Sequence, residues 1–409
     1  MIDLDVVRSK IVGAMTLLDP VEVPCRDALG LVLATDLVSS EPIPPFANTA
    51  MDGYAVRAAS TQGADDRAPV RLRVVGELPA GHAPTVPVGD GEAIRIMTGA
   101  PMPDGADAIV MVERTERDGD DAVLVHQEAT PGDHVRRAGG DLEAGDLVFE
   151  AGTLLRPAHL GVLASLDVAR ALVYPRARVG VLSTGDELVE SGALQPGKIR
   201  DANRPMLLAL LDRAGVEAVN LGMARDDEAA MTATLEDALE RCDAVITSGG
   251  VSVGDYDYMS AALERIAASD PDPRAAVDWY QVAIRPAKPL CFAIVRGRPV
   301  FGLPGNPVSS LVSFELFARP ALLTMMGRRD PYRAEVAARA EHAFVRKPDG
   351  KLHLDRVHVH VENGHYAVAS VGKQESHTLS ATAGADGLVL VPDGDGVDEG
   401  DEVRVILLD

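Results

Sequence analysis

The stretch at residues 243–259, DAVITSGGVSVGDYDYM, constrains the fold of this chain most, because a short apolar run stops there at a diglycine. The run at 244–246 is rich in β-branched residues and predicts a buried strand. Gly249 and Gly250 permit backbone conformations and close approaches that a side chain forbids, so main-chain N–H groups can converge on a phosphate. The stretch therefore predicts a strand that feeds an anion-binding loop.

Two aspartates, Asp255 and Asp257, follow these glycines. Hard divalent cations prefer carboxylate oxygens, so this spacing can hold Mg²⁺ beside a bound phosphate. The same residues also suit a tight strand-to-helix turn with solvated acids, because short glycine motifs often match by chance. Taken alone, the stretch leaves both interpretations open.

Helix and strand patterns alternate around this stretch. Residues 179–183 and 216–222 have strand patterns, and residues 203–215 have a helix pattern with Pro205 in its first turn. The segment at 227–242 predicts a further helix with one apolar face, formed by Met231, Leu235 and Leu239. These units predict a mostly parallel sheet with ligands bound beyond the carboxyl ends of its strands.

The chain of 409 residues predicts roughly two to four domains rather than one core. We expect a discontinuous first domain, an inserted β domain, a central α/β domain and a C-terminal β domain. Val6, Val7, Ile11 and Met15 predict an N-terminal helix, and we expect the segment at 142–166 to pack back on it. The expected boundaries are 1–43 with 140–175 for the first domain, then 44–139, 176–327 and 328–409 for the others.

Composition excludes several classes of function. The formal charge of −23 opposes binding to nucleic acid or to anionic membranes, so we expect neither as a partner. Three widely separated cysteines show no zinc spacing and fit a reducing cytosol. We see no secretion signal and no run near the ~18 apolar residues that span a bilayer, so we expect a cytoplasmic protein.

Three further motifs carry candidate chemistry. TGDEL puts the carboxylates of Asp186 and Glu187 after a strand, although acids there often only cap a helix. AIRPAKP offers Arg285 and Lys288 to an oxyanion, although two basic residues are more often solvated. In GLPGNPVS, Asn306 can cap a helix with Pro307 in its first position, and that helix start is a second candidate anion site.

Together the motifs resemble the molybdopterin molybdenumtransferase family, whose members include MoeA and the gephyrin E domain. SGGVSVGDYD, STGDEL, RPAKP and GLPGNPVS carry the resemblance, with NTAMDGYAV at 48–56 and IMTGAPMPDGADAIV at 96–110. The two N-terminal motifs matter most, because the α/β domain alone is also similar to molybdopterin adenylyltransferases and CinA-type proteins. The resemblance spans nearly the whole chain in matching order.

The resemblance implies an L-shaped, four-domain subunit in a homodimer. Its central domain would be MoaB/MogA-like, its first domain would be a linker and dimerisation domain, and its last would be β-barrel-like. It also implies the reaction: molybdate and adenylylated molybdopterin give molybdenum cofactor and AMP in a Mg²⁺-dependent step. Molybdopterin adenylyltransferase would be the upstream partner, and molybdoenzyme chaperones would be further partners.

The resemblance also carries site residues over to this chain. Those expected to act in catalysis are Asp52, Thr98, Asp141, Glu187, Asp226 and Asp257, and the last three are also the expected metal ligands. The first three would act across the dimer cleft on the central domain of the partner subunit. The expected binding residues for pterin, pyrophosphate and molybdate are Thr184, Gly185, Ser248, Gly249, Gly250, Ser252, Gly254, Arg285, Lys288, Pro304, Asn306, Pro307, Ser309, Arg356 and Ser376.

Alternatives to this interpretation remain. Asp52 and Asp141 also suit turns that their own side chains cap, and His358 and His360 suit a solvated strand face rather than a metal site. The chain carries Gln281 where some bacterial members have a lysine. Two other functions compete: a pterin-binding scaffold without turnover, and a CinA-like nucleotide hydrolase, against which the two N-terminal motifs argue.

Overall fold

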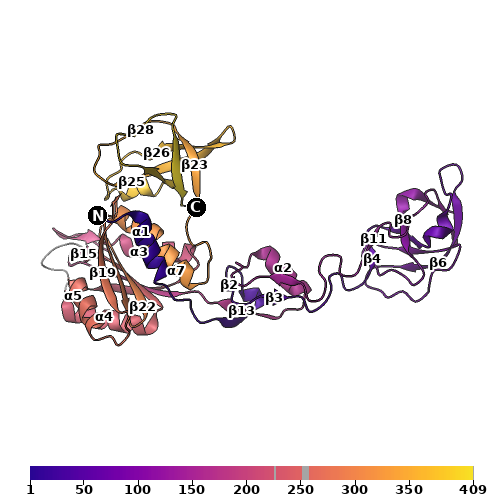
Figure 1. Ribbon diagram of the computed structural model, residues 1–409, viewed down its shortest axis with the longest axis horizontal. Coiled ribbons are helices and arrows are strands. Elements are labelled where there is room, and N and C mark those ends of the chain that lie inside the picture. Colours follow the sequence, from indigo (N-terminus) through magenta and orange to yellow (C-terminus); the bar gives the residue numbers. More distant parts are fainter. Residues whose placement is uncertain (225–226, 251–257, 409) are drawn as a thin grey trace.

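The computed structural model describes residues 1–224, 227–250 and 258–408. Its largest body is an α/β unit around a six-stranded sheet in the order β17-β14-β18-β22-β21-β19 (Figure 1). The first four of these strands run parallel and the last two pair antiparallel, so the sheet is mixed but mostly parallel, as expected. The strands are β14 (Arg178–Thr184), β17 (Glu217–Ala224), β18 (Ala244–Ser248), β19 (Ala276–Gln281), β21 (Pro289–Val295) and β22 (Arg298–Leu303).

Helices cover both faces of this sheet (Figure 1). On one face, α4 (Glu228–Arg241) and α5 (Tyr258–Ala268) bury an apolar stripe, and that of α4 includes the predicted Met231, Leu235 and Leu239. On the other face lie α1 (Leu4–Gly13), α3 (Asn203–Arg213), α6 (Pro307–Ser313) and α7 (Arg319–Met325). The short parallel pair β15 (Leu188–Val189) and β16 (Ile199–Arg200) follows β14.

The helices α6 and α7 join through a π-helical segment at Phe314–Ala318 into one helix, Pro307–Met325. By length and composition this helix could cross a membrane, which the sequence pattern did not suggest. However, 83% of it is buried inside the protein, where it packs on the sheet. Its apolar character is therefore explained by the core.

The C-terminal unit is a closed β-barrel. Its strands are β23 (Glu335–Ala340), β25 (Leu352–Glu362), β26 (His365–Ser370), β27 (Gly387–Val391) and β29 (Glu402–Leu407), and pairing of β25 with β27 closes the ring. The pair β24 (Phe344–Val345) and β28 (Gly396–Val397) and the short helix α8 (Leu379–Thr382) complete it. One strand from outside, β20 (Ile284–Arg285), pairs in parallel with the start of β25 and so joins the two units.

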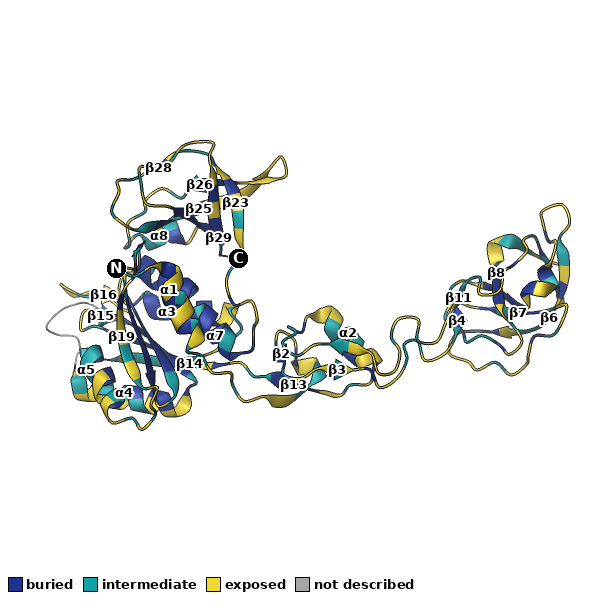
Figure 2. Cartoon of the chain, viewed as in Figure 1, coloured by how far each residue is buried: buried dark blue, intermediate teal, exposed yellow. Residues whose placement is uncertain are grey.

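A linker unit lies between the α/β unit and the far end of the molecule (Figure 1). It is built from two separate parts of the chain: β1 (Val21–Pro24), the 3-10 turn Cys25–Asp27, β2 (Val32–Leu33) and β3 (Leu37–Val38), with β12 (Leu147–Phe149), α2 (Pro157–Ser165) and β13 (Arg170–Tyr174). The core of this unit lies between α2 and the strands, as the burial colours in Figure 2 also show.

A distal β unit lies at the far end of the molecule (Figure 1). A six-stranded sheet in the order β8-β5-β7-β6-β10-β9 forms its centre. Its elements are β4 (Asn48–Thr49), β5 (Gly53–Val56), the 3-10 turn Ala58–Thr61, β6 (Val70–Leu78), β7 (Glu92–Ile96), β8 (Ala108–Met111), the 3-10 turn Val112–Arg114, β9 (Thr115–Arg117), β10 (Ala122–Val125) and β11 (Val135–Arg136).

The predicted fold class is confirmed: a mostly parallel α/β unit, an inserted β unit and a C-terminal barrel. The exact domain boundaries stay predictions. Two local expectations were wrong. The segment at 142–166 does not pack on α1, because α2 buries its apolar side in the linker unit, whereas α1 packs on the π-helical segment and α7. In the predicted N-terminal helix, Val7 and Ile11 are buried together with Leu4, but Val6 is exposed.

Candidate functional site

Three loops meet at the carboxyl edge of the sheet, where β14, β18 and β22 end side by side. Asn203, the first residue of α3, ties two of them together. Its side-chain nitrogen donates to Ser248 Oγ at 2.7 Å and to the carbonyl of Gly305 at 2.7 Å. Its side-chain oxygen is buried and has no hydrogen-bond partner among the described residues. The Asn203 side chain therefore joins two loops through its nitrogen, while its oxygen remains an acceptor without a donor among the described residues.

The diglycine after β18 is required by the backbone. Gly249 has φ 96° and Gly250 has φ 69°, in the left-handed region that side chains disfavour. A Cβ on Gly249 would lie 2.6 Å from the carbonyl oxygen of Thr184. Both the unusual conformation and the close approach predicted for this loop are therefore present.

A cavity of about 290 Å³ opens at this edge, and we call it the glycine-loop cavity. It takes side chains and backbone from the ends of all three strands. Its lining residues are Thr184, Glu187, Leu188, Ile199, Arg200, Asp201, Ala202, Asn203, Ser248, Gly249, Gly305, Asn306, Pro307 and His377. Five of the predicted binding residues and the predicted acid Glu187 lie in this one place.

A second cavity, of about 470 Å³, lies between the α/β unit and the barrel, and we call it the interdomain cavity. Its lining residues are Ile284, Arg285, Pro286, Ala287, Lys288, Pro289, Ser309, Lys351, Gln374, Glu375, Ser376 and His377. His377 lines both cavities, so the two adjoin. Four of the predicted binding residues, Arg285, Lys288, Ser309 and Ser376, come from three separate parts of the chain and thus surround one space.

The interdomain cavity has more cationic than acidic lining residues, with Arg285, Lys288 and Lys351 against Glu375. Arg285 and Lys288 are exposed and form no ion pair or side-chain hydrogen bond with any residue that the structure describes. Between them Ala287 adopts φ 70°, a strained conformation for a residue with a side chain. In a chain with a formal charge of −23, two unpaired cations on a strained loop indicate an anion site.

Arg356 was expected to contribute to this site, but it does not reach the cavity. It is 1% exposed, and its guanidinium donates to Gln374 Oε1, to Thr382 Oγ1 and to backbone carbonyls of the loop at 373–378. That loop also accepts a bond, at Ser376 O, from the backbone N–H of Val308 at the start of α6. Arg356 therefore anchors the loop that carries Ser376.

Asp52 and Thr98 lie together in the distal unit. This unit is at the opposite end of the molecule from the α/β unit and the barrel (Figure 1), whose residues line both cavities. Asp52 Oδ1 accepts from the Thr98 N–H at 2.7 Å and from Thr98 Oγ1 at 2.8 Å. These two bonds lower the pKa of Asp52, which keeps it ionised. Asp141 is exposed on the connection between the linker and distal units, where its N–H donates to Ile43 O.

Several predicted residues fall elsewhere. Asp226, Ser252, Gly254 and Asp257 lie outside the described residues. Gly185, Gly250 and Pro304 adjoin the glycine-loop cavity in sequence but do not line it. Asn306 precedes α6 with Pro307 in the first position, as predicted, but its side chain forms no capping bond. The N–H of Val308 at this helix start donates to the carbonyl of Ser376 in the neighbouring loop.

Several lining residues were not predicted from the sequence, and three of them matter for the chemistry of the cavities. Asn203 lies at the predicted start of a helix, and His377 follows the predicted Ser376. Lys351 lies in none of the motifs that carried the prediction. Gln281 lines neither cavity.

Among the described residues there is no group of three or more His, Cys, Asp or Glu side chains placed to hold a metal. His358 and His360 are about half exposed and lie near Asp386 and Glu341, as expected for a solvated strand face. Glu187 is the one proposed metal ligand that the structure describes. Its carboxylate is of the kind that Mg²⁺ prefers.

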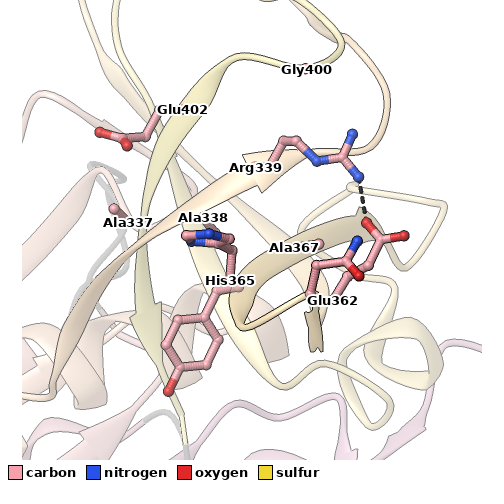
Figure 3. Close-up of a pocket in the computed structure, with 10 residues that line it drawn as sticks. Ala337, Ala338, Arg339, Glu362, His365, Ala367, Gly400 and Glu402 are labelled. Carbon is pink, nitrogen blue, oxygen red and sulfur yellow. Dashed lines mark hydrogen bonds and ion pairs between the residues drawn. The ribbon is translucent and has the colours of Figure 1, made fainter.

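A further cavity of about 470 Å³ lies on the barrel, against β23 and β26 (Figure 3). None of the predicted residues lines it. Its charged groups include Arg339 and Glu362, which pair with each other at 2.6 Å and are about half exposed. Its volume equals that of the interdomain cavity, but its arginine is already paired with a carboxylate, so the lining does not indicate a particular ligand.

Three family models match consecutive parts of the chain. The MoeA N-terminal region (domain I and II) matches residues 2–166, a probable molybdopterin binding domain matches residues 180–324, and the MoeA C-terminal region (domain IV) matches residues 339–408. Both cavities lie within or between the last two regions.

Whole-length relatives agree with these models. Molybdopterin molybdenumtransferase 2 of Mycobacterium tuberculosis is 44% identical to this chain, and the alignment covers 91% of each of the two sequences. The molybdopterin molybdenumtransferase of Haemophilus influenzae is 36% identical, covering 93% and 92%. The solved molybdopterin biosynthesis moeA protein of Pyrococcus horikoshii OT3 is 30% identical, with a TM-score of 0.84 over 100% of both chains.

Proposed function

The chain belongs to the molybdopterin molybdenumtransferase family, a family of transferases, and from this premise we propose that it inserts molybdenum from molybdate into adenylylated molybdopterin. In this reaction the phosphoanhydride bond of the adenylylated substrate breaks and AMP leaves. The proposal needs a cradle for a pyrophosphate and, beside it, a site for a tetrahedral oxyanion. The linings of the two adjoining cavities support this proposal.

The glycine-loop cavity suits the pyrophosphate and pterin. Backbone at a diglycine can approach phosphate oxygens closely, and the strand ends of an α/β sheet are where such ligands bind. The buried side-chain oxygen of Asn203, which has no partner in the described part of the chain, suits a donor on the pterin. Ser248 and Thr184 add hydroxyls to the same wall.

The interdomain cavity suits molybdate, and this is the observation that carries the proposal. Arg285 and Lys288 face a space that also receives the hydroxyl-bearing residues Ser309 and Ser376. Unpaired cations and hydroxyls can bind a tetrahedral dianion from several sides. Since His377 borders both cavities, the oxyanion would lie next to the bond that breaks.

Mg²⁺ belongs to the same proposal, with Glu187, Asp226 and Asp257 as its ligands. Glu187 borders the glycine-loop cavity, where a bound cation would neutralise charge on the phosphates. The other two acids are assigned by the family resemblance. Cytoplasmic location, supply by molybdopterin adenylyltransferase and delivery to molybdoenzyme chaperones also remain part of the proposal.

We further propose a homodimer in which Asp52, Thr98 and Asp141 act on the cavities of the partner subunit. In one chain the distal unit lies at the far end from the α/β unit and the barrel (Figure 1), whose residues line both cavities. Asp52 and Thr98 of the distal unit therefore cannot act there in the same subunit, and Asp141 lies on the connection that leads to that unit. Large apolar side chains are exposed along the linker unit and beside it, which favours an interface between copies. They are Val21, Leu29, Val38, Phe46 and Leu147.

The proposal predicts that purified protein releases AMP from adenylylated molybdopterin only when molybdate and Mg²⁺ are both present. The measurement is AMP by chromatography, with omission of molybdate as the control. If the protein releases no AMP with all components present, the proposed reaction is wrong.

A further inference from the structure

Among the barrel residues that line the interdomain cavity is one lysine, Lys351, that neither the motifs nor the family resemblance assigned. Building on the proposed function, we propose that Lys351 binds the oxyanion directly, opposite Arg285 and Lys288. We also propose that Arg356 is a positioning residue, which holds the loop at 373–378 and does not touch the anion. The two roles follow from where each cation directs its N–H donors.

Arg356 has no donor to spare for an anion. A guanidinium has five N–H groups. Nε donates to Gln374 Oε1 at 3.2 Å, Nη1 to Thr378 O at 3.0 Å and Thr382 Oγ1 at 2.8 Å, and Nη2 to Lys373 O at 2.9 Å and Glu375 O at 3.3 Å. With all five used inside a buried site, contact with an anion would require breaking a loop bond.

Lys351 is placed differently. It lies directly before β25, whose residues Leu352 and His353 pair with Ile284 and Arg285 of β20. This pairing between the two units brings Lys351 to the wall of the cavity that the Arg285 loop lines from the other side. The side chain is partly accessible, at 22% exposed, and so can meet a ligand from solvent.

The Lys351 ammonium also has donors left. It donates to Asp349 Oδ2 at 3.0 Å and to no other group in the described part of the chain. An ammonium has three N–H groups, so two remain for a ligand. The Asp349 carboxylate also accepts a bond from Arg346 Nη2 at 2.6 Å and lies 3.2 Å from His353 Nε2. Its negative charge is therefore divided among three partners and does not neutralise Lys351 alone.

Asp349 keeps Lys351 in place without cancelling its charge. Burial raises the pKa of Asp349, but hydrogen bonds from Lys351 and His353 outweigh that effect and lower the pKa to about 2. The carboxylate is therefore ionised at any working pH and orients the ammonium at the cavity wall. A dianion in this cavity would then meet three cations from two units.

The test for Lys351 compares three variants of the full-length protein. Lys351→Met removes the charge, and we expect the Kd for molybdate and its KM to rise about tenfold, as for loss of one charge-assisted hydrogen bond, with kcat little changed. Lys351→Arg should restore binding. Lys347→Met is the matched control, because Lys347 is an exposed lysine of the preceding segment that lines neither cavity, and it should behave as wild type.

The test for Arg356 uses Arg356→Lys and Arg356→Gln. Neither variant can supply five donors, so we expect both to speed hydrogen exchange at residues 373–378 and to lower kcat, without rescue by lysine. The proposal is overturned if Lys351→Met binds molybdate as wild type does, or if Arg356→Lys keeps normal exchange while it weakens molybdate binding. Because molybdate binding is measured by calorimetry without turnover, failure of the proposed reaction would be seen separately.

Discussion

The Asp52 carboxylate accepts both of its hydrogen bonds in the described part of the chain from one residue, Thr98. One comes from the backbone N–H and one from the hydroxyl. The hydroxyl bond links the two motifs MDGYA and MTGAP, which are about forty-six residues apart in the chain. Thr98 therefore acts on the carboxylate of Asp52, in addition to any role of its own.

Replacing Thr98 by valine should raise the pKa of Asp52 toward its ordinary value, because the hydroxyl donor is lost while the backbone donor stays. A lowered pKa in the folded protein contributes stability above the unfolded pKa, and this stability is lost as pH falls through the folded pKa. The variant should therefore lose that contribution at a higher pH. The measurement is a carboxyl NMR titration of Asp52.

The control for this titration is Thr115→Val, which removes a hydroxyl that donates to Val112 O in the same unit. It should leave the pKa of Asp52 unchanged. An Asp52 titration that is the same in Thr98→Val and in wild type would show that the hydroxyl does not stabilise the carboxylate.

The sequence predicted some residues of the site and missed others for a physical reason. Arg285, Lys288 and Ser309 were identified because each lies in a motif with its own local signal. Lys351 and Asn203 were missed because their positions matter only after distant segments pair. No local pattern reveals that β20 joins β25, or that the loop after β22 meets the start of α3.

At the scale of elements, the π-helical segment between α6 and α7 is held by a buried carboxylate. The Glu315 side chain is fully buried and forms ion pairs with Arg333 Nε at 2.9 Å and with Arg213 Nη2 at 3.1 Å. Arg213 ends α3, and Arg333 lies just before the first barrel strand, β23. The cluster therefore fastens the connection to the barrel against the α/β unit.

Glu315→Ala should lower the free energy of unfolding by about 3–5 kcal/mol, because it leaves the mostly buried guanidinium groups of Arg319 and Arg333 without their partner. Glu362→Ala, which removes the half-exposed pair with Arg339, should cost about 1 kcal/mol or less. Urea unfolding followed by circular dichroism compares the two. Equal effects would mean that the buried cluster does not stabilise the fold.

Elements were easier to predict than their packing. The predicted helix at 203–215 is α3, and the run at 244–246 lies within β18, because apolar spacing is a property of one segment. The segment at 142–166, which contains α2, was likewise expected to pack on another element, but the sequence did not reveal which one. Which surface covers that side depends on the whole chain, and the linker unit covers it rather than α1.

At the scale of the whole molecule, the candidate residues fall at two ends of an extended subunit (Figure 1). Glu187, Arg285 and Lys288 lie at one end, and Asp52 and Thr98 lie at the other. A single chain cannot bring these groups together in this conformation. If both groups act in one reaction, each reaction site must combine two subunits.

Mixing two inactive variants tests this central claim most directly. Asp52→Asn alters the distal unit and Glu187→Gln alters the α/β unit, so a mixed dimer contains one site with both changes and one intact site. After free subunit exchange, molybdate-dependent AMP release should recover to about a quarter of the wild-type rate, since half of the dimers are mixed. Mixing Glu187→Gln with Lys288→Met, both in the α/β unit, should give no recovery. If the first mixture stays as inactive as its separate variants, the reaction site is not shared between subunits.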